Sequence, residues 1–295
     1  MIVTIDPNAG FCYGVDRTIE IAENELAKEG KLLCLGQIVH NEGEERRLKK
    51  MGLVVIGYDE FKMLNNVKVL IRAHGEPPET YKIAAQNNIQ LIDGSCPIVL
   101  SLQKKIRKSY ENTPGDNTQV VIFGKKNHPE VIGLAGQTGN KAIIIENEED
   151  IAQIDFSRPV RLFAQTTKSP VKYNEMIASI SEKIKAFDEN GKPVLKAENS
   201  ICRHVSNRDE NLRQFAADND VVFFVGGENS SNGKYLFGVC QQVNPQTWYI
   251  QSAEMLQSSW FSGVKKVGVT GATSTPGWLL TEVAEKIKSM TNQTY

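Results

Sequence analysis

Short apolar stretches alternate with amphipathic stretches along the whole chain. Twelve apolar stretches have the length and the β-branched or aromatic content of strands. They lie near 2–5, 32–38, 53–56, 67–72, 89–92, 120–124, 142–145, 160–164, 193–197, 221–225, 247–250 and 266–270. Helical patterns lie between most of them, for example at 42–51, 78–87, 170–187 and 277–290. This alternation predicts an α/β protein with mainly parallel sheets, because successive parallel strands need a crossover between them.

Polar motifs follow nine of the twelve predicted strands. In chain order they are Cys12, VHN with His40, AHG with His74, Cys96, NHPE with His128 and Glu130, QTT with Thr166 and Thr167, Cys202, NSSN at 229–232, and GATSTP at 271–276. One cysteine and two further motifs recur three times, so the twelve strands suggest three sets of four in chain order. We therefore expect three similar α/β units around one centre, spanning 1–97, 98–195 and 196–295. Ligands of parallel sheets bind outside the carboxyl ends of the strands, where all nine motifs lie.

Composition excludes several classes of protein. The 295 residues include 34 Lys plus Arg and 35 Asp plus Glu, and this balance argues against a nucleic-acid partner. No apolar run approaches the roughly 20 residues that span a bilayer. The first residues lack the basic and long apolar regions of a signal peptide. We expect a soluble, cytoplasmic protein that binds neither nucleic acid nor membrane.

The five cysteines fall into two groups. Cys34 and Cys240 lie in apolar segments, KLLCLG and YLFGVC, and we expect both to be packing residues. Cys12, Cys96 and Cys202 each lie between a predicted strand and a predicted helix. Backbone N–H groups at a helix N-terminus favour the thiolate over the thiol. These three cysteines are therefore candidate metal ligands or nucleophiles.

Three thiolates can hold zinc with one open position, or an iron–sulfur cluster with one open iron. The spacing separates these alternatives, because zinc sites usually draw two ligands from one short segment. Here the ligands are 84 and 106 residues apart, one from each expected unit, with Cys96 assigned to the start of the second unit. A cluster is wide enough to accept one thiolate from each of three units, so we favour the cluster. Three unrelated buried thiols are the remaining alternative.

Other motifs predict an anion site. Three histidines, His40, His74 and His128, occupy similar strand ends beside small or polar residues. Hydroxyl and amide groups gather at two further strand ends, at Ser230, Ser231, Asn232, Thr273, Ser274 and Thr275. Imidazoles, hydroxyls and helix N-terminal amides together can bind phosphate. Glu130 follows His128 in the same loop, where it would be a proton source beside that anion, or else an ordinary surface carboxylate.

Together these motifs resemble the 4-hydroxy-3-methylbut-2-enyl diphosphate reductase (IspH/LytB) family. The resemblance covers essentially the whole chain, from GFCYGVDRTI at 10–19 to the ATSTP loop, with HPEV-x-G, QTT and SICRHVSNRDE between them. Each motif is short, but nine in the family's order are specific. One departure is GATSTP, where the family often has GAS-x-P. We align Ser274 with the family serine because S-x-P is retained.

The resemblance implies a pseudo-threefold cloverleaf of three α/β units around a [4Fe–4S] cluster with one non-cysteine-ligated iron. Cys12, Cys96 and Cys202 would be the metal ligands. The implied reaction is the reduction of (E)-4-hydroxy-3-methylbut-2-enyl diphosphate to isopentenyl and dimethylallyl diphosphate, the last step of the methylerythritol phosphate pathway. An electron donor such as ferredoxin or flavodoxin is expected.

The resemblance also implies residue roles. Glu130, relayed through Thr167, would supply the proton as the catalytic pair. The implied substrate-binding residues are His40, His74, His128, Thr167, Ser230, Ser231, Asn232 and Ser274.

Two functions of other classes remain open. One is a metal-dependent hydrolase of a phosphorylated metabolite, and the other is a non-enzymatic iron–sulfur carrier. A carrier needs neither a phosphate pocket nor an acid, so the NSSN, QTT and HPE motifs would then have no role.

Overall fold

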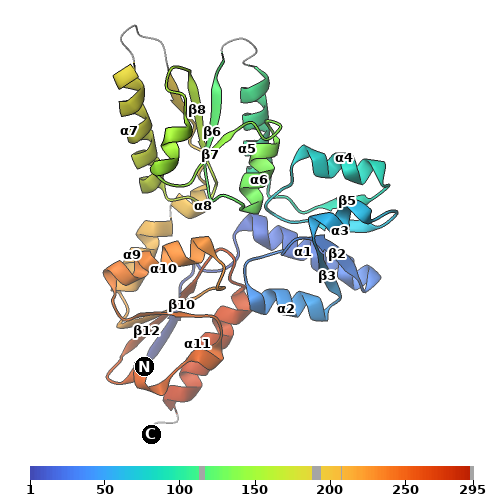
Figure 1. Cartoon of the computed structure of the whole chain (residues 1–295). Coiled ribbons are helices and arrows are strands. Elements are labelled where there is room, and N and C mark those ends of the chain that lie inside the picture. The colour runs from blue at the N-terminus through green and yellow to red at the C-terminus, as the bar shows by residue number, and fades with distance from the viewer. Residues whose placement is uncertain (113–116, 188–193, 207, 293–295) are drawn as a thin grey trace. The chain divides into compact units, whose positions relative to one another are not determined.

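The computed structural model describes residues 1–112, 117–187, 194–206 and 208–292 (Figure 1). The chain divides into two compact units, which are described separately. The first unit contains residues Met1–Ile56 and Asn207–Tyr295, and the second contains Gly57–Ser206. No helix in the described ranges is long and apolar enough to cross a bilayer.

All twelve predicted strands are present, and they form three four-stranded sheets. The strands are β1 (Ile2–Ile5), β2 (Leu32–Leu35), β3 (Leu53–Ile56), β4 (Lys68–Ile71), β5 (Gln90–Asp93), β6 (Gln119–Phe123), β7 (Ile143–Ile145), β8 (Val160–Ala164), β9 (Leu195–Ala197), β10 (Val221–Val225), β11 (Thr247–Ile250) and β12 (Lys266–Gly271). The pairings within each unit are parallel. The predicted α/β class with parallel sheets is confirmed.

The helices mostly connect successive strands, as parallel pairing requires. They are α1 (Tyr13–Glu29), α2 (Glu42–Lys50), α3 (Tyr58–Met63), α4 (Pro78–Gln86), α5 (Pro97–Glu111), α6 (Pro129–Gly136), α7 (Pro170–Phe187), α8 (Arg203–Ser206), α9 (Arg208–Ala217), α10 (Ser231–Val243) and α11 (Gly277–Asn292). Short 3₁₀ helices lie at Glu149–Gln153, Ala253–Met255 and Ser258–Phe261. The four helical ranges given above from the sequence match α2, α4, α7 and α11 to within two residues.

The three sheets repeat one strand order. The orders are β3-β2-β4-β5, β7-β6-β8-β9 and β11-β10-β12-β1. In the third sheet the N-terminal β1 takes the place that β5 and β9 take in the other two, and Ile2 to Ile5 pair with Lys266 to Val269 of β12. The three sets of four strands are therefore confirmed, but β1, which lies in the expected range 1–97, pairs within the sheet of the range 196–295. The fourth strand in each of these orders is followed in the chain by a candidate cysteine. Cys12 follows β1, Cys96 follows β5 and Cys202 follows β9.

In the first unit, β10 is covered on both faces. Phe223 belongs to a core that α11 covers through Val283 and Ile287. Phe224 belongs to a core on the opposite face, with Leu212 of α9 and Leu236 of α10. Figure 1 shows α10 and α11 on either side of this strand. Burial on both faces explains why VVFFV is continuously apolar rather than alternating.

The second unit repeats this construction around β6 and β8. Ile122 of β6 packs with Ile106 of α5 and Leu134 of α6 on one face. Phe123 packs with Ile180 of α7 on the other face. Each fully buried side chain of this size stabilises the fold by roughly 1.5–3 kcal/mol. Both layered cores therefore hold the carboxyl ends of their strands firmly, and the polar motifs follow those ends.

Candidate active site

Three of the five cysteines differ from the other two in exposure and position. Cys12 is the N-cap residue of α1, Cys96 is that of α5, and Cys202 directly precedes the four-residue helix α8. All three are partly exposed, whereas Cys34 and Cys240 are completely buried. Burial raises the pKa of the Cys240 thiol to about 12, which keeps it protonated. The three partly exposed cysteines are therefore the candidate metal ligands.

Each of the three cysteines makes the same backbone hydrogen bond within its unit. The N–H of Cys12 donates to the carbonyl of Thr273 at 3.2 Å. The N–H groups of Cys96 and Cys202 donate to the carbonyls of Ala73 and Thr166, both at 2.9 Å. Every acceptor lies just beyond the third strand of the same sheet, β12, β4 or β8. The three cysteines thus occupy equivalent positions in three equivalent sheets, with Cys12 in the first unit and the other two in the second.

Glu130 is a buried acid near the start of α6. Pro129 occupies the first helical position, and the preceding His128 accepts the N–H of Glu130 at Nδ1 at 3.2 Å. The side chain of Glu130 is only 2% exposed. Thr166 donates its backbone N–H to Oε1 at 2.7 Å and its hydroxyl to Oε2 at 2.8 Å.

Burial determines the charge of this acid. It raises the pKa of Glu130 from 4.5 to about 7, while the two hydrogen bonds from Thr166 act in the opposite direction. A pKa near neutrality suits a group that must hold a proton and release it during a reaction.

The two threonines of the QTT motif have different partners. The hydroxyl of Thr167, which the sequence analysis placed in the relay, accepts a hydrogen bond from Gln165 at 2.9 Å. The hydroxyl at the Glu130 carboxylate is that of Thr166. Both threonines lie in the turn that follows β8, and within this turn only Thr166 faces the acid. The QTT motif contains no signal that distinguishes them.

Two of the predicted histidines lie together in the second unit. The rings of His74 and His128 are edge to face, with centroids 5.3 Å apart. His74 follows β4 and is positioned by Gly75, whose φ of +69° is in the left-handed region. A Cβ atom at Gly75 would also lie 2.7 Å from the Gln103 side chain. Because Nδ1 of His128 accepts a hydrogen bond, its neutral ring carries the proton on Nε2, where it can donate to an anion.

His40 belongs to the first unit and lies beside the loop that precedes NSSN. The next residue, Asn41, caps α2 by accepting the N–H of Glu44 at 3.0 Å. A Cβ atom at Gly227 would lie 2.3 Å from the His40 carbonyl oxygen, so only glycine permits this approach. The structure therefore brings the His40 and NSSN loops together, as the predicted anion site requires.

The hydroxyl and amide groups of the first unit also converge. Ser230 caps α10 by accepting the N–H of Gly233 at 3.0 Å, and its hydroxyl lies 3.3 Å from that of Ser274. Asn232 donates its side-chain N–H to the Thr273 hydroxyl at 3.0 Å. The side chain of Ser231 lies outside the described part of the structure. Thr275 is engaged elsewhere, since its hydroxyl donates to the Val225 carbonyl and accepts the Ala272 N–H.

Asn232 carries a buried acceptor that lacks a protein partner. Its side chain is 9% exposed, and Oδ1 has no hydrogen-bond partner among the described residues. The two ends of an amide have the same shape, so a half-turn lets Oδ1 accept from the Thr273 hydroxyl. The NH₂ group then points to the unpartnered side and can donate to an anion. With Ser230, Ser274 and the N-terminus of α10, this makes a phosphate site chemically reasonable.

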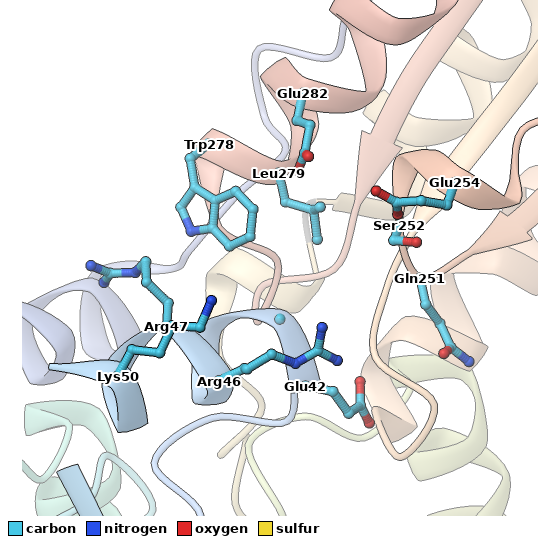
Figure 2. Close-up of a pocket in the computed structure, with 11 residues that line it drawn as sticks. Glu42, Arg46, Arg47, Lys50, Gln251, Ser252, Glu254, Trp278, Leu279 and Glu282 are labelled. Atoms are coloured by element: carbon cyan, nitrogen blue, oxygen red, sulfur yellow. The ribbon is translucent and has the colours of Figure 1, made fainter. Parts of the chain in front are cut away.

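A separate hollow of about 470 Å³ in the first unit does not contain the predicted site residues. Figure 2 shows it between α2, the segment 251–254 and α11. Its charged lining side chains are Glu42, Arg46, Arg47, Lys50, Glu254 and Glu282. Three cations against three carboxylates leave no excess positive charge for a diphosphate. The hollow is therefore not the anion site.

The chain matches one protein family over almost its whole length. The family model for the LytB protein matches residues 3–288. A 4-hydroxy-3-methylbut-2-enyl diphosphate reductase from Bacteroides fragilis is 51% identical over 287 residues, which cover 97% of each chain. The protein of the same name from Phocaeicola vulgatus is 48% identical over 286 residues, which cover 97% of this chain and 98% of the relative.

Two solved structures share the fold. A structure of (E)-4-hydroxy-3-methyl-but-2-enyl diphosphate reductase, described as the terminal enzyme of the non-mevalonate pathway, has a TM-score of 0.73 and 35% identity. It covers 98% of this chain and is itself covered completely. The E-1-hydroxy-2-methyl-but-2-enyl-4-diphosphate reductase of Plasmodium falciparum has a TM-score of 0.83 and 25% identity, covering 96% of this chain and 87% of its own.

Proposed function

The chain belongs to the LytB protein family, and from this membership we propose the reaction that it catalyses. It reduces (E)-4-hydroxy-3-methylbut-2-enyl diphosphate to isopentenyl and dimethylallyl diphosphate. Two electrons and two protons replace the C–OH bond by a C–H bond and release water. The reaction therefore needs an electron source and a proton source at the same carbon–oxygen bond.

One residue carries this proposal, because Thr166 contacts both the proposed proton source and a candidate metal ligand. Its N–H and hydroxyl bind the Glu130 carboxylate, and its carbonyl accepts the N–H of Cys202. Thr166 alone thereby links the acid to a candidate metal ligand. Neither a hydrolase nor an iron–sulfur carrier requires this arrangement.

The donor set fits an iron–sulfur cluster. Three partly exposed thiols occupy equivalent positions in the three sheets, and the two remaining cysteines are buried and unsuited to ligation. We propose that Cys12, Cys96 and Cys202 hold a [4Fe–4S] cluster with one non-cysteine-ligated iron. When bound, the cluster would supply electrons and a Lewis-acid iron for the leaving hydroxyl.

The side chains of the protein would act on the two ends of the substrate. Glu130, protonated near neutral pH, would donate its proton to the departing hydroxyl. Thr166 would hold the carboxyl in place, and Thr167 stays a proposed proton relay and substrate contact. The diphosphate donors that we propose are His40, Ser230, Asn232 and Ser274 in the first unit and His74 and His128 in the second. Ser231 is retained from the sequence alone.

The remaining assignments rest on the family resemblance. We propose a small iron–sulfur or flavin protein, ferredoxin or flavodoxin, as the electron donor, and a cytoplasmic location. We also retain the ranges 1–97, 98–195 and 196–295 as three α/β units. The repeated strand order supports three units, although β1 pairs with the strands of the last range.

The direct test is reduction of the substrate by the cluster-loaded protein under anaerobic conditions. Dithionite with a viologen supplies the electrons, and iron, sulfide and both products are measured. Ser substitution of Cys12, Cys96 or Cys202 should remove most of the iron and the turnover, because an alkoxide replaces a thiolate poorly. Cys34→Ser and Cys240→Ser are matched controls that should retain iron. Iron loss in the controls but not in the ligand variants would reject the assignment.

A further inference from the structure

A buried charged cluster lies at the ends of β1 and β12 in the first unit. It consists of Asp6, Arg208 and Thr270, which are 4%, 5% and 0% exposed. Nη2 of Arg208 donates to Asp6 Oδ2 at 3.3 Å, to Thr270 Oγ1 at 3.2 Å and to the Gly271 carbonyl at 2.7 Å. The Thr270 hydroxyl also donates to Asp6 Oδ2 at 2.7 Å. None of these groups takes part in the reaction proposed above.

The cluster joins the beginnings of two functional loops. Asp6 begins the segment that leads to Cys12, and its Oδ1 accepts the N–H of Asn8 at 2.9 Å. Gly271 is the last residue of β12 and leads into the segment that contains Ser274. Further along, the two loops meet again where the N–H of Cys12 donates to the Thr273 carbonyl. The metal-ligand loop and the anion loop are therefore connected at both ends, and Arg208 makes one of these connections.

Arg208 also occupies a particular place in the chain. It lies six residues after Cys202 and begins α9, just after the chain passes from the second unit to the first. A single side chain thus fixes the beginning of α9 and the starts of the loops that carry Cys12 and Ser274.

A stability role alone does not account for this cluster. Removing a guanidinium and a carboxylate from water costs free energy that their attraction only partly returns, and apolar replacements of such pairs are often as stable. Here Nε of Arg208 also has no hydrogen-bond partner among the described residues. What the guanidinium offers instead is geometry, because its rigid planar end holds Nη2 against three acceptors, the Asp6 carboxylate, the Thr270 hydroxyl and the Gly271 carbonyl.

We propose that Arg208, acting through Asp6 and Thr270, is a positioning residue that fixes the Cys12 loop relative to the Ser274 loop. It thereby sets the geometry of one metal ligand and of the diphosphate donors together. This inference rests on the proposed function, since it assigns Cys12 and Ser274 the roles given above. Arg208 itself contacts neither the substrate nor the metal.

The test compares three variants that separate charge from geometry. Arg208→Lys keeps the positive charge but loses the planar donors. Arg208→Met leaves Asp6 buried without its cation and should lower the thermal midpoint. The double variant Asp6→Asn/Arg208→Met removes both charges and should regain most of that loss. Arg213→Met is the matched control, because Arg213 lies on the same helix but is exposed and donates a hydrogen bond to Gln242.

Three properties of the anaerobic, cluster-loaded variants are measured: iron content, the electron paramagnetic resonance spectrum of the reduced cluster, and affinity for inorganic pyrophosphate. We expect Arg208→Lys and the double variant to show an altered spectrum, weaker pyrophosphate binding, and a loss of metal affinity of about 10- to 100-fold, as for other residues that orient metal ligands. The double variant should show these losses even after its thermal midpoint recovers, whereas a merely structural role predicts that all properties recover together.

A wild-type spectrum and wild-type pyrophosphate affinity in Arg208→Lys would overturn the proposal, and this variant keeps the test decisive if the double variant does not fold. The same measurements on the wild-type protein distinguish a failure of the proposed function from a failure of the role of Arg208. If it binds neither cluster nor pyrophosphate, the proposed function fails. If it binds both and Arg208→Lys is unchanged, only the role of Arg208 fails.

Discussion

Glu130→Gln tests the proposed acid with little change of shape. In the protonated acid, Oε1 accepts the Thr166 N–H, and the carboxyl proton can point to the Thr166 hydroxyl oxygen. A glutamine reproduces both interactions, with its carbonyl as acceptor and its NH₂ group as donor. It cannot release a proton. The variant therefore resembles the protonated enzyme at every pH while lacking its chemistry.

The pKa of Glu130 determines the size of the effect on stability. The folded carboxyl has a pKa of about 7, against 4.5 for the ordinary group, so folding takes up a proton between these pH values. The free energy of unfolding must then fall as the pH rises through this window, and above it the ionised buried carboxylate costs about 3 kcal/mol. Glutamine does not ionise, so the variant should be more stable than the wild type by up to about that amount at pH about 8. The difference should be smallest at pH about 5.

Turnover should fall in Glu130→Gln, although its stability should rise. General acid catalysis typically contributes 10²- to 10⁴-fold, and we expect a loss of about this size in Glu130→Gln, with the cluster and substrate binding retained. Glu76→Gln is the matched control. Glu76 is also a buried carboxyl of the second unit whose pKa is raised by burial, but it has no place in the proposed reaction. This control should retain turnover.

Denaturant unfolding of the anaerobic, cluster-loaded protein at both pH values gives the stability difference, and viologen-linked reduction gives turnover. Infrared difference spectra between wild type and variant report the protonated carboxyl directly. Equal stability differences at the two pH values would show that Glu130 ionises normally. Wild-type turnover in the variant, with electron delivery shown to be faster than catalysis, would remove Glu130 from the mechanism.

Four other substitutions have clear expected outcomes. Replacing His74 with Asn should weaken pyrophosphate binding measured by calorimetry and leave the iron content unchanged; unaltered affinity would exclude this imidazole as a diphosphate ligand. Gly227→Ala should also weaken pyrophosphate binding, because the new methyl group would lie 2.3 Å from the neighbouring histidine carbonyl. Gly238→Ala has open space within its helix and should instead stabilise the protein by up to about 1 kcal/mol. Thr166→Val removes a hydrogen bond that lowers the pKa of the buried acid, so the decline of kcat with rising pH should move to higher pH; a decline at unchanged or lower pH would argue against this contact.

The local pattern of the sequence was enough to predict every strand in the described part of the chain. The continuous apolar segment 221–225 indicates a strand buried on both faces, and the structure confirms it. The same pattern located Cys12, Cys96 and Cys202 at the ends of strands, because a polar loop after an apolar strand is visible without any knowledge of neighbours. The separation of these cysteines from Cys34 and Cys240 followed from the same local contrast.

The partners of these elements could be decided only by the tertiary structure. β1 pairs with β12 at the other end of the chain, and Arg208 binds Asp6 across 202 positions, so neither contact leaves a local pattern. Thr166 and Thr167 are adjacent and chemically identical, and only the direction of each side chain places one hydroxyl at the acid. Hydrophobic periodicity records whether a residue is buried or exposed. It does not record which distant residue completes the burial, and the raised pKa of Glu130 and the placement of the Cys12 loop both depend on those distant residues.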